Sequence, residues 1–191
     1  MKISAILLSA GLSRRMGGDK LLLEYCGMSL FERAIALLAQ LPTYEWIVVT
    51  TKERREKVNL PSGVRVVLNY NPQIGQSESI RLGVSEARGT HFMFLVADQP
   101  KLSVSALEPI LSAAQENPDK IVFPLVRGKP SSPTIFPARF KAGLLALSGD
   151  MGGREVRQAF PDLCFGVEVQ NPCDFVDIDD LEDYKKLNDH I

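Results

Sequence analysis

The sequence has few cysteines, few histidines and almost no net charge. The three cysteines, Cys26, Cys164 and Cys173, lack metal-ligand spacing, and their odd number argues against a disulfide framework, so we expect reduced thiols. With only His91 and His190, a Ser-His-Asp hydrolase is poorly supported. The sequence has 22 Lys and Arg residues and 23 Asp and Glu residues, so no electrostatic field of one sign attracts nucleic acid or an anionic membrane. Any anion site must be local.

Long apolar runs are missing as well. No stretch approaches the roughly 20 apolar residues that a membrane-spanning helix needs, and the N-terminal apolar run ends at a polar loop rather than at a signal-peptide cleavage site. We therefore expect a cytoplasmic protein without a membrane partner. The 191 residues, 45% hydrophobic and 24% charged, suit one domain over residues 1–191 with an ample core.

Short apolar runs alternate with helical patterns along the chain. The predicted strands are Ile3–Ser9, Trp46–Thr51, Val64–Leu68, Phe92–Val96, Ile121–Phe123 and Thr134–Phe136. The predicted helices are one capped by Ser29 with Glu32, then Glu78–Arg88, Val104–Gln115, Ala138–Leu147, Arg154–Ala159 and Leu181–Asn188. Several strands are too continuously apolar to face water on one side. We therefore expect an α/β fold with a mostly parallel sheet and helices on both faces, crossed by an irregular arm over Pro124–Pro137.

A basic, glycine-containing loop, SAGLSRRMGGDK, follows the first predicted strand at residues 9–20. Ligands bind outside the carboxyl ends of parallel strands, and Gly11 and Gly17 let a phosphate approach the backbone closely. Arg15 and Lys20 could neutralise its charge. The loop matches neither the dinucleotide fingerprint nor the P-loop. A solvated basic turn is the alternative, but the position after the first strand favours an anion site.

Carboxylates follow at two further places. Asp98 stands directly after the fourth predicted strand, where it suits Mg²⁺, although a turn or helix-capping role is the alternative. Asp177, Asp179 and Asp180 precede the last predicted helix, and residues 175–178 are expected to form a short strand. Asp180 is expected to cap that helix, which leaves at least one of the other two for a metal.

The stretch GQSESIR at residues 75–81 places polar side chains at a predicted helix start. Ser77 is expected to cap this helix. Gln76 and Ser79 could read a nucleobase or a ribose.

Together, five ordered blocks resemble a known family: ILLSAGLSRRMGGDKLLL, GQSESIRLGV, LVADQP, SPTIFPARFKAGLLALSGDMGGREV and DIDDLEDYKKL. They are similar to the molybdenum cofactor nucleotidyltransferases, most closely to the cytidylyltransferase branch. The resemblance implies a Rossmann-like nucleotidyltransferase fold in a single domain. It also implies CTP and molybdopterin or molybdenum cofactor as substrates, and a client molybdoenzyme as a possible partner. For the oligomeric state we expect a monomer or weak dimer.

The family motif of the first loop implies roles for individual residues. Gly11, Arg15 and Lys20 would hold the triphosphate, and the backbone of Ser9, Ala10 and Gly11 would line the base and phosphates. Gln76 and Ser79 join this nucleotide-binding set only as the side chains that could read the base or ribose.

The implied metal is Mg²⁺, held by Asp98 and Asp179 with Asp177 next in line. The terminal phosphate of molybdopterin would attack the α-phosphate of CTP and release pyrophosphate. No protein nucleophile is needed, so catalysis would fall to alignment and charge screening by Arg15, Lys20 and Asp98.

Two motifs bear on the choice of base. Ser9-Ala10-Gly11 and Asp98-Gln99-Pro100 are similar to the cytidylyl pattern, whereas Ser131-Ser132-Pro133 departs from the family's usual acceptor motif. The alternatives are a guanylyltransferase of the same family, a sugar-phosphate nucleotidyltransferase, and a non-catalytic cofactor-binding maturation factor. An NAD-dependent oxidoreductase ranks last because the required glycine loop is missing.

Overall fold

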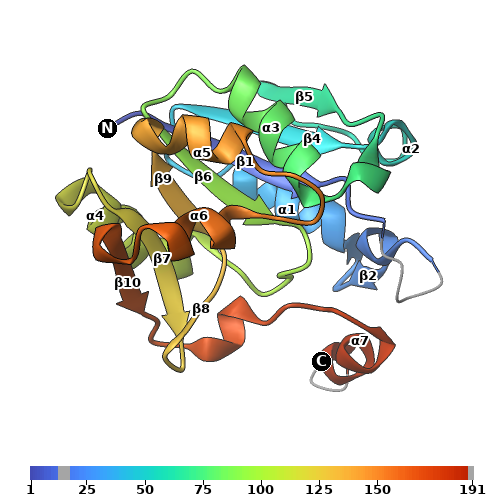
Figure 1. Ribbon diagram of the computed structural model, residues 1–191. Helices are drawn as coiled ribbons and strands as arrows, with labels where there is room; N and C mark the ends of the chain where they lie inside the picture. The colour runs from blue at the N-terminus through green and yellow to red at the C-terminus, as the bar shows by residue number, and fades with distance from the viewer. Residues whose placement is uncertain (13–17, 189–191) are drawn as a thin grey trace.

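The computed structural model describes residues 1–12 and 18–188, which form one eight-stranded sheet and a small hairpin (Figure 1). The spatial order of the sheet is β10-β7-β9-β6-β1-β4-β5, and β8 pairs with β7. The strands of this sheet are β1 (Ile3–Ser9), β4 (Glu45–Thr50), β5 (Val64–Leu68), β6 (His91–Val96), β7 (Ile121–Val126), β8 (Lys129–Pro130), β9 (Thr134–Pro137) and β10 (Cys164–Glu168). The hairpin consists of β2 (Glu24–Tyr25) and β3 (Met28–Ser29).

The sheet is mostly parallel, as the sequence predicts. Strands β6, β1, β4 and β5 pair in parallel, and so do β7 and β10. The exceptions are β9, which runs antiparallel to both β6 and β7, and the short β8, which runs antiparallel to β7. Too few residues separate the end of β7 from the start of β9 for a crossover, which needs a dozen or more. The expectation of an irregular arm over Pro124–Pro137 is therefore wrong in part, since much of it pairs into the sheet.

Helices cover both faces of the sheet, as expected. The helices are α1 (Leu30–Leu38), α2 (Lys52–Arg55), α3 (Gln76–Glu86), α4 (Val104–Glu116), α5 (Lys141–Leu145), α6 (Gly153–Ala159) and α7 (Leu181–Asn188). Short 3-10 turns are η1 (Lys20–Leu22), η2 (Pro72–Ile74), η3 (Ala138–Phe140), η4 (Pro161–Leu163) and η5 (Pro172–Phe175). Ala5 and Leu7 of β1 pack on the side of α1 and α4, whereas Ile6 packs on the side of α3, α5 and α6. This period of two builds a core on each face.

Several local predictions are confirmed and others are wrong. Ser29 and Glu32 form the expected capping box at the start of α1. The strand expected at residues 175–178 is absent from the structure. Turn η5 ends at Phe175, and the backbone after it is held by a hydrogen bond from the Ile178 N–H to the Asp98 carbonyl at 2.9 Å. The sequence prediction also missed α2, the β2–β3 hairpin and β10.

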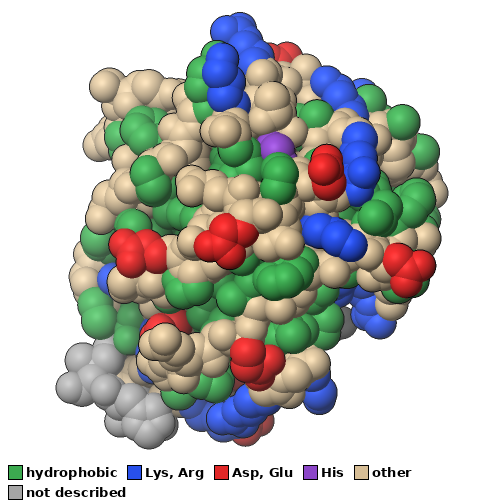
Figure 2. All heavy atoms as spheres, turned by 90° about the vertical axis from the view of Figure 1, so that its left-hand side faces the viewer, with side chains coloured by type: hydrophobic (Ala, Val, Ile, Leu, Met, Phe, Trp, Pro, Cys, Tyr) green, Lys and Arg blue, Asp and Glu red, His purple; other side chains and the backbone are tan. Residues whose placement is uncertain are grey.

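The surface around α4 carries charges of both signs. On this face, acidic and basic side chains are scattered among apolar and neutral ones (Figure 2), as a formal net charge of −1 leads one to expect. Across residues 1–12 and 18–188, none of the helices has the length and apolar character required to cross a membrane.

Candidate active site

The carboxyl ends of β1 and β6 open onto a cleft of about 400 Å³, which we call the loop cleft. Its lining includes these predicted site residues: Ser9, Ala10, Gly11, Lys20, Gln76, Ser79, Asp98 and Asp179. Asp177 lies in a neighbouring cleft, and Arg15 lies outside the described residues. The fold therefore brings segments from both ends of the chain to one edge of the sheet, where parallel strands place ligands.

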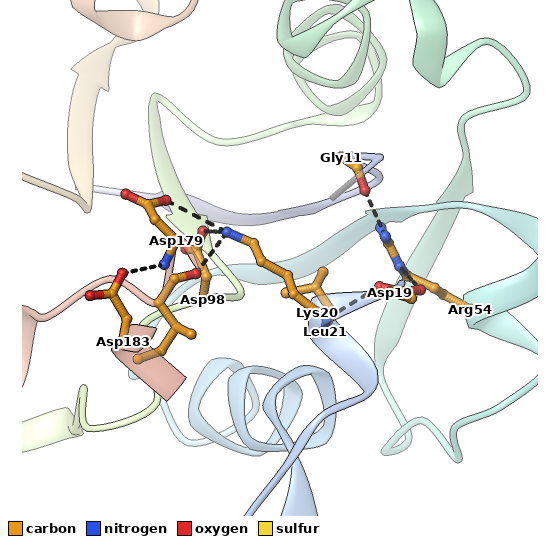
Figure 3. A network of polar contacts seen from close by, with 9 residues as sticks. Gly11, Asp19, Lys20, Leu21, Arg54, Asp98, Asp179 and Asp183 are labelled. Carbon is orange, nitrogen blue, oxygen red and sulfur yellow. Dashed lines mark hydrogen bonds and ion pairs between the residues drawn. The ribbon is translucent and has the colours of Figure 1, made fainter. Parts of the chain in front are cut away.

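Lys20 connects the N-terminal and C-terminal segments inside the loop cleft. Its ammonium donates to Asp98 Oδ2 at 2.7 Å and to the carbonyl of Ile178 at 2.9 Å, and it lies 3.8 Å from Asp179 Oδ1 (Figure 3). The Lys20 and Asp98 side chains are 16% and 20% exposed, so water screens this pair less than it would screen a surface pair. A phosphate that binds Lys20 must compete with these oxygens.

Asp98 has one oxygen to spare. While Oδ2 accepts from Lys20, Oδ1 is buried and has no hydrogen-bond partner among the described residues. A buried carboxylate oxygen without a donor is costly, and a cation or water would satisfy it. Within the described ranges, no three His, Cys, Asp or Glu side chains converge as a ready-made metal cage. Mg²⁺ takes few protein ligands and completes its shell with water and phosphate oxygens, so the partnerless Asp98 oxygen is compatible with it; Asp98 and Asp179 as its ligands stay a prediction.

Asp177 lies beside the same cluster. Desolvation of its carboxyl group, together with repulsion from Asp98 and Asp179, raises the pKa of Asp177 to about 6. Gln99 and Lys20 act in the opposite direction without cancelling the shift. This crowding of negative charge is what a divalent cation would relieve.

Asp180 has the capping role that the sequence predicts. Its Oδ1 accepts from the backbone N–H groups of Glu182 and Asp183, each at 2.9 Å, at the start of α7. The carboxylate of Asp183 in turn accepts from the N–H of Asp179 at 3.1 Å (Figure 3). The acidic segment is therefore divided between a helix cap and the cleft.

The end of β1 presents backbone rather than side chains. The Ser9 hydroxyl is buried and donates to the Val49 carbonyl at 2.9 Å, so it points to the neighbouring strand β4. Ala10 is buried and Gly11 is exposed. A Cβ placed on Gly11 would meet no atom of the described residues within 4 Å. The nucleotide-binding roles of these three residues stay predictions.

Helix α3 forms another wall of the loop cleft. Ser79 is buried, and its hydroxyl oxygen accepts from Asn69 Nδ2 at 3.0 Å, whereas Gln76 is exposed. The expectation that Ser77 caps this helix is wrong. The helix begins at Gln76, Gly75 is the cap residue with no side-chain cap bond, and the Ser77 N–H donates to the Gly149 carbonyl at 3.2 Å.

Arg54 is a site residue that the sequence prediction missed. It is buried in α2, and its guanidinium donates to the carbonyl of Ser9. It also donates to the carbonyl of Gly11 and to the carboxylate of Asp19 (Figure 3). The only signal in the sequence is KERR after the second strand, where several charged residues look alike. Only the tertiary contacts single out one of them.

A second cleft of about 430 Å³ adjoins the first, and we call it the arm cleft. Its lining includes Ser131, Ser132, Arg154, Arg157 and Asp177. It shares the following lining residues with the loop cleft: Leu8, Gln76, Val96 and Asp150. The Arg157 guanidinium lies 4.5 Å from the Phe123 ring centroid, and desolvation lowers its pKa. Two adjoining clefts could hold two substrates, with the carboxylate cluster between them.

Comparison with solved structures supports the fold assignment. The protein Rv0371c of Mycobacterium tuberculosis H37Rv superposes with a TM-score of 0.83 over 99% of this chain and 98% of its own, at 20% identity. A nucleotidyl transferase from Methanothermobacter gives a TM-score of 0.80 at 25% identity, over 99% of this chain and 97% of its own. The expected nucleotidyltransferase fold is confirmed.

Sequence comparison gives the family. The molybdenum cofactor guanylyltransferase of Pseudomonas fluorescens (strain Pf0-1) is 30% identical over 119 residues, which is 61% of this chain and 58% of that protein. The chain spans about three fifths of the length of the curated relatives it matches. Those relatives are named guanylyltransferases, so they do not support the expected cytidylyl branch. Residues 5–163 match the family described as the MobA-like NTP transferase domain, and the chain therefore belongs to that family.

Proposed function

We propose that this protein transfers a nucleotidyl group from a nucleoside triphosphate to the terminal phosphate of molybdopterin or its metal-loaded form. The observation that carries the proposal is the pair of adjoining clefts, of which the loop cleft is lined by Lys20, Asp98 and Asp179 and the arm cleft by Asp177. The loop cleft would take the nucleotide, and the arm cleft would take the acceptor. Family membership and the names of the relatives support the same reaction class.

The reaction depends more on the alignment of the two substrates than on a side chain that acts as a nucleophile or a base. An oxygen of the acceptor phosphate forms a bond to the α-phosphorus while the bond from that phosphorus to the α–β bridging oxygen breaks, and the electron pair leaves with pyrophosphate. A phosphate monoester is largely ionised at neutral pH, so no base has to remove a proton. Lys20 would offset charge on the triphosphate, and Arg15 is proposed to do so as well.

Asp98 and Asp179 would hold Mg²⁺, with Asp177 as a further carboxylate nearby. The buried Asp98 Oδ1 without a partner supports this role. When bound, the metal screens the negative charge of the phosphates. Before the metal and the nucleotide bind, Asp98 would fix the position of Lys20 through their 2.7 Å bond.

GTP is the donor that the names of the relatives support. CTP is the second candidate, supported by the similarity of Ser9-Ala10-Gly11 and Asp98-Gln99-Pro100 to the cytidylyl pattern. The Ser9 hydroxyl is engaged by β4, so any effect of Ser9 on base choice would act through its backbone.

Pyrophosphate release tests the proposal. Purified protein with Mg²⁺ and molybdopterin is given GTP, CTP or UTP in turn, and kcat/KM is compared. A preference for GTP supports the leading candidate and a preference for CTP the second. Pyrophosphate release with a sugar phosphate in place of molybdopterin would favour the sugar-phosphate alternative. Tight nucleotide binding without pyrophosphate release would favour a non-catalytic maturation factor and contradict the proposal.

A further inference from the structure

Arg54 is a buried cation with no part in the reaction proposed above. It is 5% exposed and lies in α2, which follows β4. Its Nε donates to Asp19 Oδ2 at 2.6 Å, its Nη2 donates to the Gly11 carbonyl at 2.6 Å, and its Nη1 donates to the Ser9 carbonyl. One guanidinium therefore holds three acceptors from a single segment of chain, two of which, Gly11 and Asp19, are drawn in Figure 3.

The three acceptors lie at the two ends of that segment. Ser9 ends β1, Gly11 follows it, and both line the loop cleft. At the other end, Asp19 is the cap residue of η1, and its second oxygen, Oδ1, accepts from the Leu21 N–H at 3.2 Å. Lys20 is the first residue of this turn. Arg54 thus fixes the backbone after β1 relative to the turn that carries Lys20.

We infer that Arg54 is a positioning residue for nucleotide binding, acting with Asp19 as its partner. The inference rests on the proposed function. Arg54 joins the Gly11 backbone to the start of η1, so both walls that would meet the triphosphate are set before the ligand arrives. A site organised in advance loses less conformational freedom on binding, and its affinity rises accordingly.

Arg54 is not itself a phosphate ligand in this scheme. Its charge is offset by Asp19, and its donors are turned toward protein oxygens. A planar guanidinium has a fixed fork of donors that can serve three directions at once, whereas a lysine ammonium is a point charge on a flexible stem. Lysine at this position would keep the charge and lose the geometry.

Three substitutions separate positioning from general stability. Arg54→Lys keeps the charge, and Asp19→Asn keeps a cap for η1 while removing the negative partner. Arg55→Gln is the matched control, because the neighbouring Arg55 donates to the Val58 carbonyl and, among residues 1–12 and 18–188, not to the loop. Calorimetry with Mg²⁺ and the preferred triphosphate gives Kd, steady-state kinetics give KM for each substrate, and thermal unfolding without ligand gives Tm.

We expect Arg54→Lys and Asp19→Asn each to raise the nucleotide Kd and KM by about tenfold, or about 1.4 kcal/mol, with the acceptor KM within about twofold of the parent value. The double variant should lose less than the product of the single losses, because both act on one contact. Arg55→Gln should bind the nucleotide like the parent.

Each contrary result has a distinct meaning. If the two variants lower Tm while the nucleotide Kd, measured well below Tm, stays at the parent value, Arg54 is purely structural and the inference fails. An equal rise in KM for both substrates would also overturn it. If Arg54→Lys does not fold, the Kd and KM of Asp19→Asn decide. Should the parent bind no nucleotide with Mg²⁺, the proposed function fails and this inference fails with it.

Discussion

Lys20 has partners within the protein itself, and these contacts shape what the carboxylates around it can do. Its ammonium lies between Asp98 and Asp179, where it offsets charges that would otherwise repel each other. A metal that binds Asp98 competes with Lys20, and a phosphate that binds Lys20 releases Asp98. Metal and nucleotide are therefore expected to favour each other's binding.

Asp98→Asn should abolish the part of nucleotide binding that depends on Mg²⁺. The amide keeps the shape of the side chain but loses the charge that would attract the metal and hold Lys20. Pyrophosphate release should fall by about a hundredfold. Calorimetry with and without Mg²⁺ measures the binding, and Asp162→Asn, an exposed position in η4, is the control. Parent-like Mg²⁺ dependence in Asp98→Asn would exclude Asp98 as a metal ligand.

Asp177→Asn should stabilise the ligand-free protein at pH 8. An unfolded aspartate ionises near pH 4, about the reference value, whereas the pKa of Asp177 in the fold is raised to about 6. The folded state thus binds the proton more tightly, and its stability falls as pH rises from about 4 through 6. The asparagine variant avoids that loss. Thermal unfolding should give it a higher Tm than the parent at pH 8 and the same Tm below pH 4.

A constant Tm difference between Asp177→Asn and the parent across this pH range would show that the carboxyl group does not titrate as described. Asp162→Asn again serves as the control, because its exposed carboxyl group is expected to leave the pH dependence unchanged.

Residues of the candidate site could be predicted from the sequence only where their location in the fold follows from the strand or loop that precedes them in the chain. Asp98 follows a buried strand and Lys20 follows the first loop, so both had to reach the same sheet edge. Arg54 and Asn69 are different, because what matters is their contact with Gly11 and Ser79 across the fold. Such contacts leave no local pattern, and single charged or amide residues near a strand end are common.

At the scale of elements, strands were predictable where both faces are buried and harder to predict where they are not. The apolar run Ile3–Ser9 is β1 itself. Strand β10 is a half-exposed edge strand of five residues that includes Gly166, so it lacks both a continuous apolar run and clean alternation. Helix α2 has only four residues, too few to show a helical period.

The start of α3 depends on a glycine that the packing requires. Gly75 has φ of +112°, and a Cβ placed there would lie 2.4 Å from the Gly149 carbonyl oxygen. That carbonyl accepts from the Ser77 N–H, so the close approach links the loop after α5 to the first turn of α3. The wall shared by the two clefts is built on this contact, since Gln76 and Asp150 follow Gly75 and Gly149 directly.

Gly75→Ala should destabilise the protein by about 1–3 kcal/mol from backbone strain, with a further cost from the clash. Gly128→Ala is the control, because Gly128 also has a positive φ, +75°, but no described atom lies within 4 Å of its Cβ position. Urea unfolding measures both. The Gly75 variant should lose more stability than the Gly128 variant and should bind nucleotide more weakly. Equal losses would show that the packing against Gly149 is not important.

At the scale of the whole molecule, the two clefts meet where the N-terminal loop, α3 and the C-terminal segment converge. The C-terminal segment is tied down by the Ile178–Asp98 backbone bond and by Lys20, and the Tyr184 hydroxyl donates to the Glu24 carbonyl at 2.6 Å. Ligand binding in the loop cleft should therefore stabilise the chain from β1 to α7 as one unit. A rise in the Tm of global unfolding should measure this stabilisation.

Lys20 should make the stabilisation by Mg²⁺ depend on the nucleotide. In the parent, Mg²⁺ alone should change Tm little, because Lys20 already pairs with Asp98. Mg²⁺ with the preferred triphosphate at 100 times its Kd should stabilise by about 2.7 kcal/mol, which is roughly 5–10 °C in Tm for a chain of this size.

Lys20→Met should increase the stabilisation by Mg²⁺ alone and decrease the further stabilisation by the triphosphate. The substitution leaves Asp98, Asp177 and Asp179 without their ammonium neighbour. Mg²⁺ alone should then raise Tm, while the triphosphate, having lost a cationic partner, should add less than in the parent. Lys52→Met is the matched control, since Lys52 is exposed and pairs only loosely with Glu56, at 4.0 Å. A thermal-shift titration compares all three proteins. If Mg²⁺ alone shifts Tm equally in all three, Lys20 does not compete with a metal at these carboxylates.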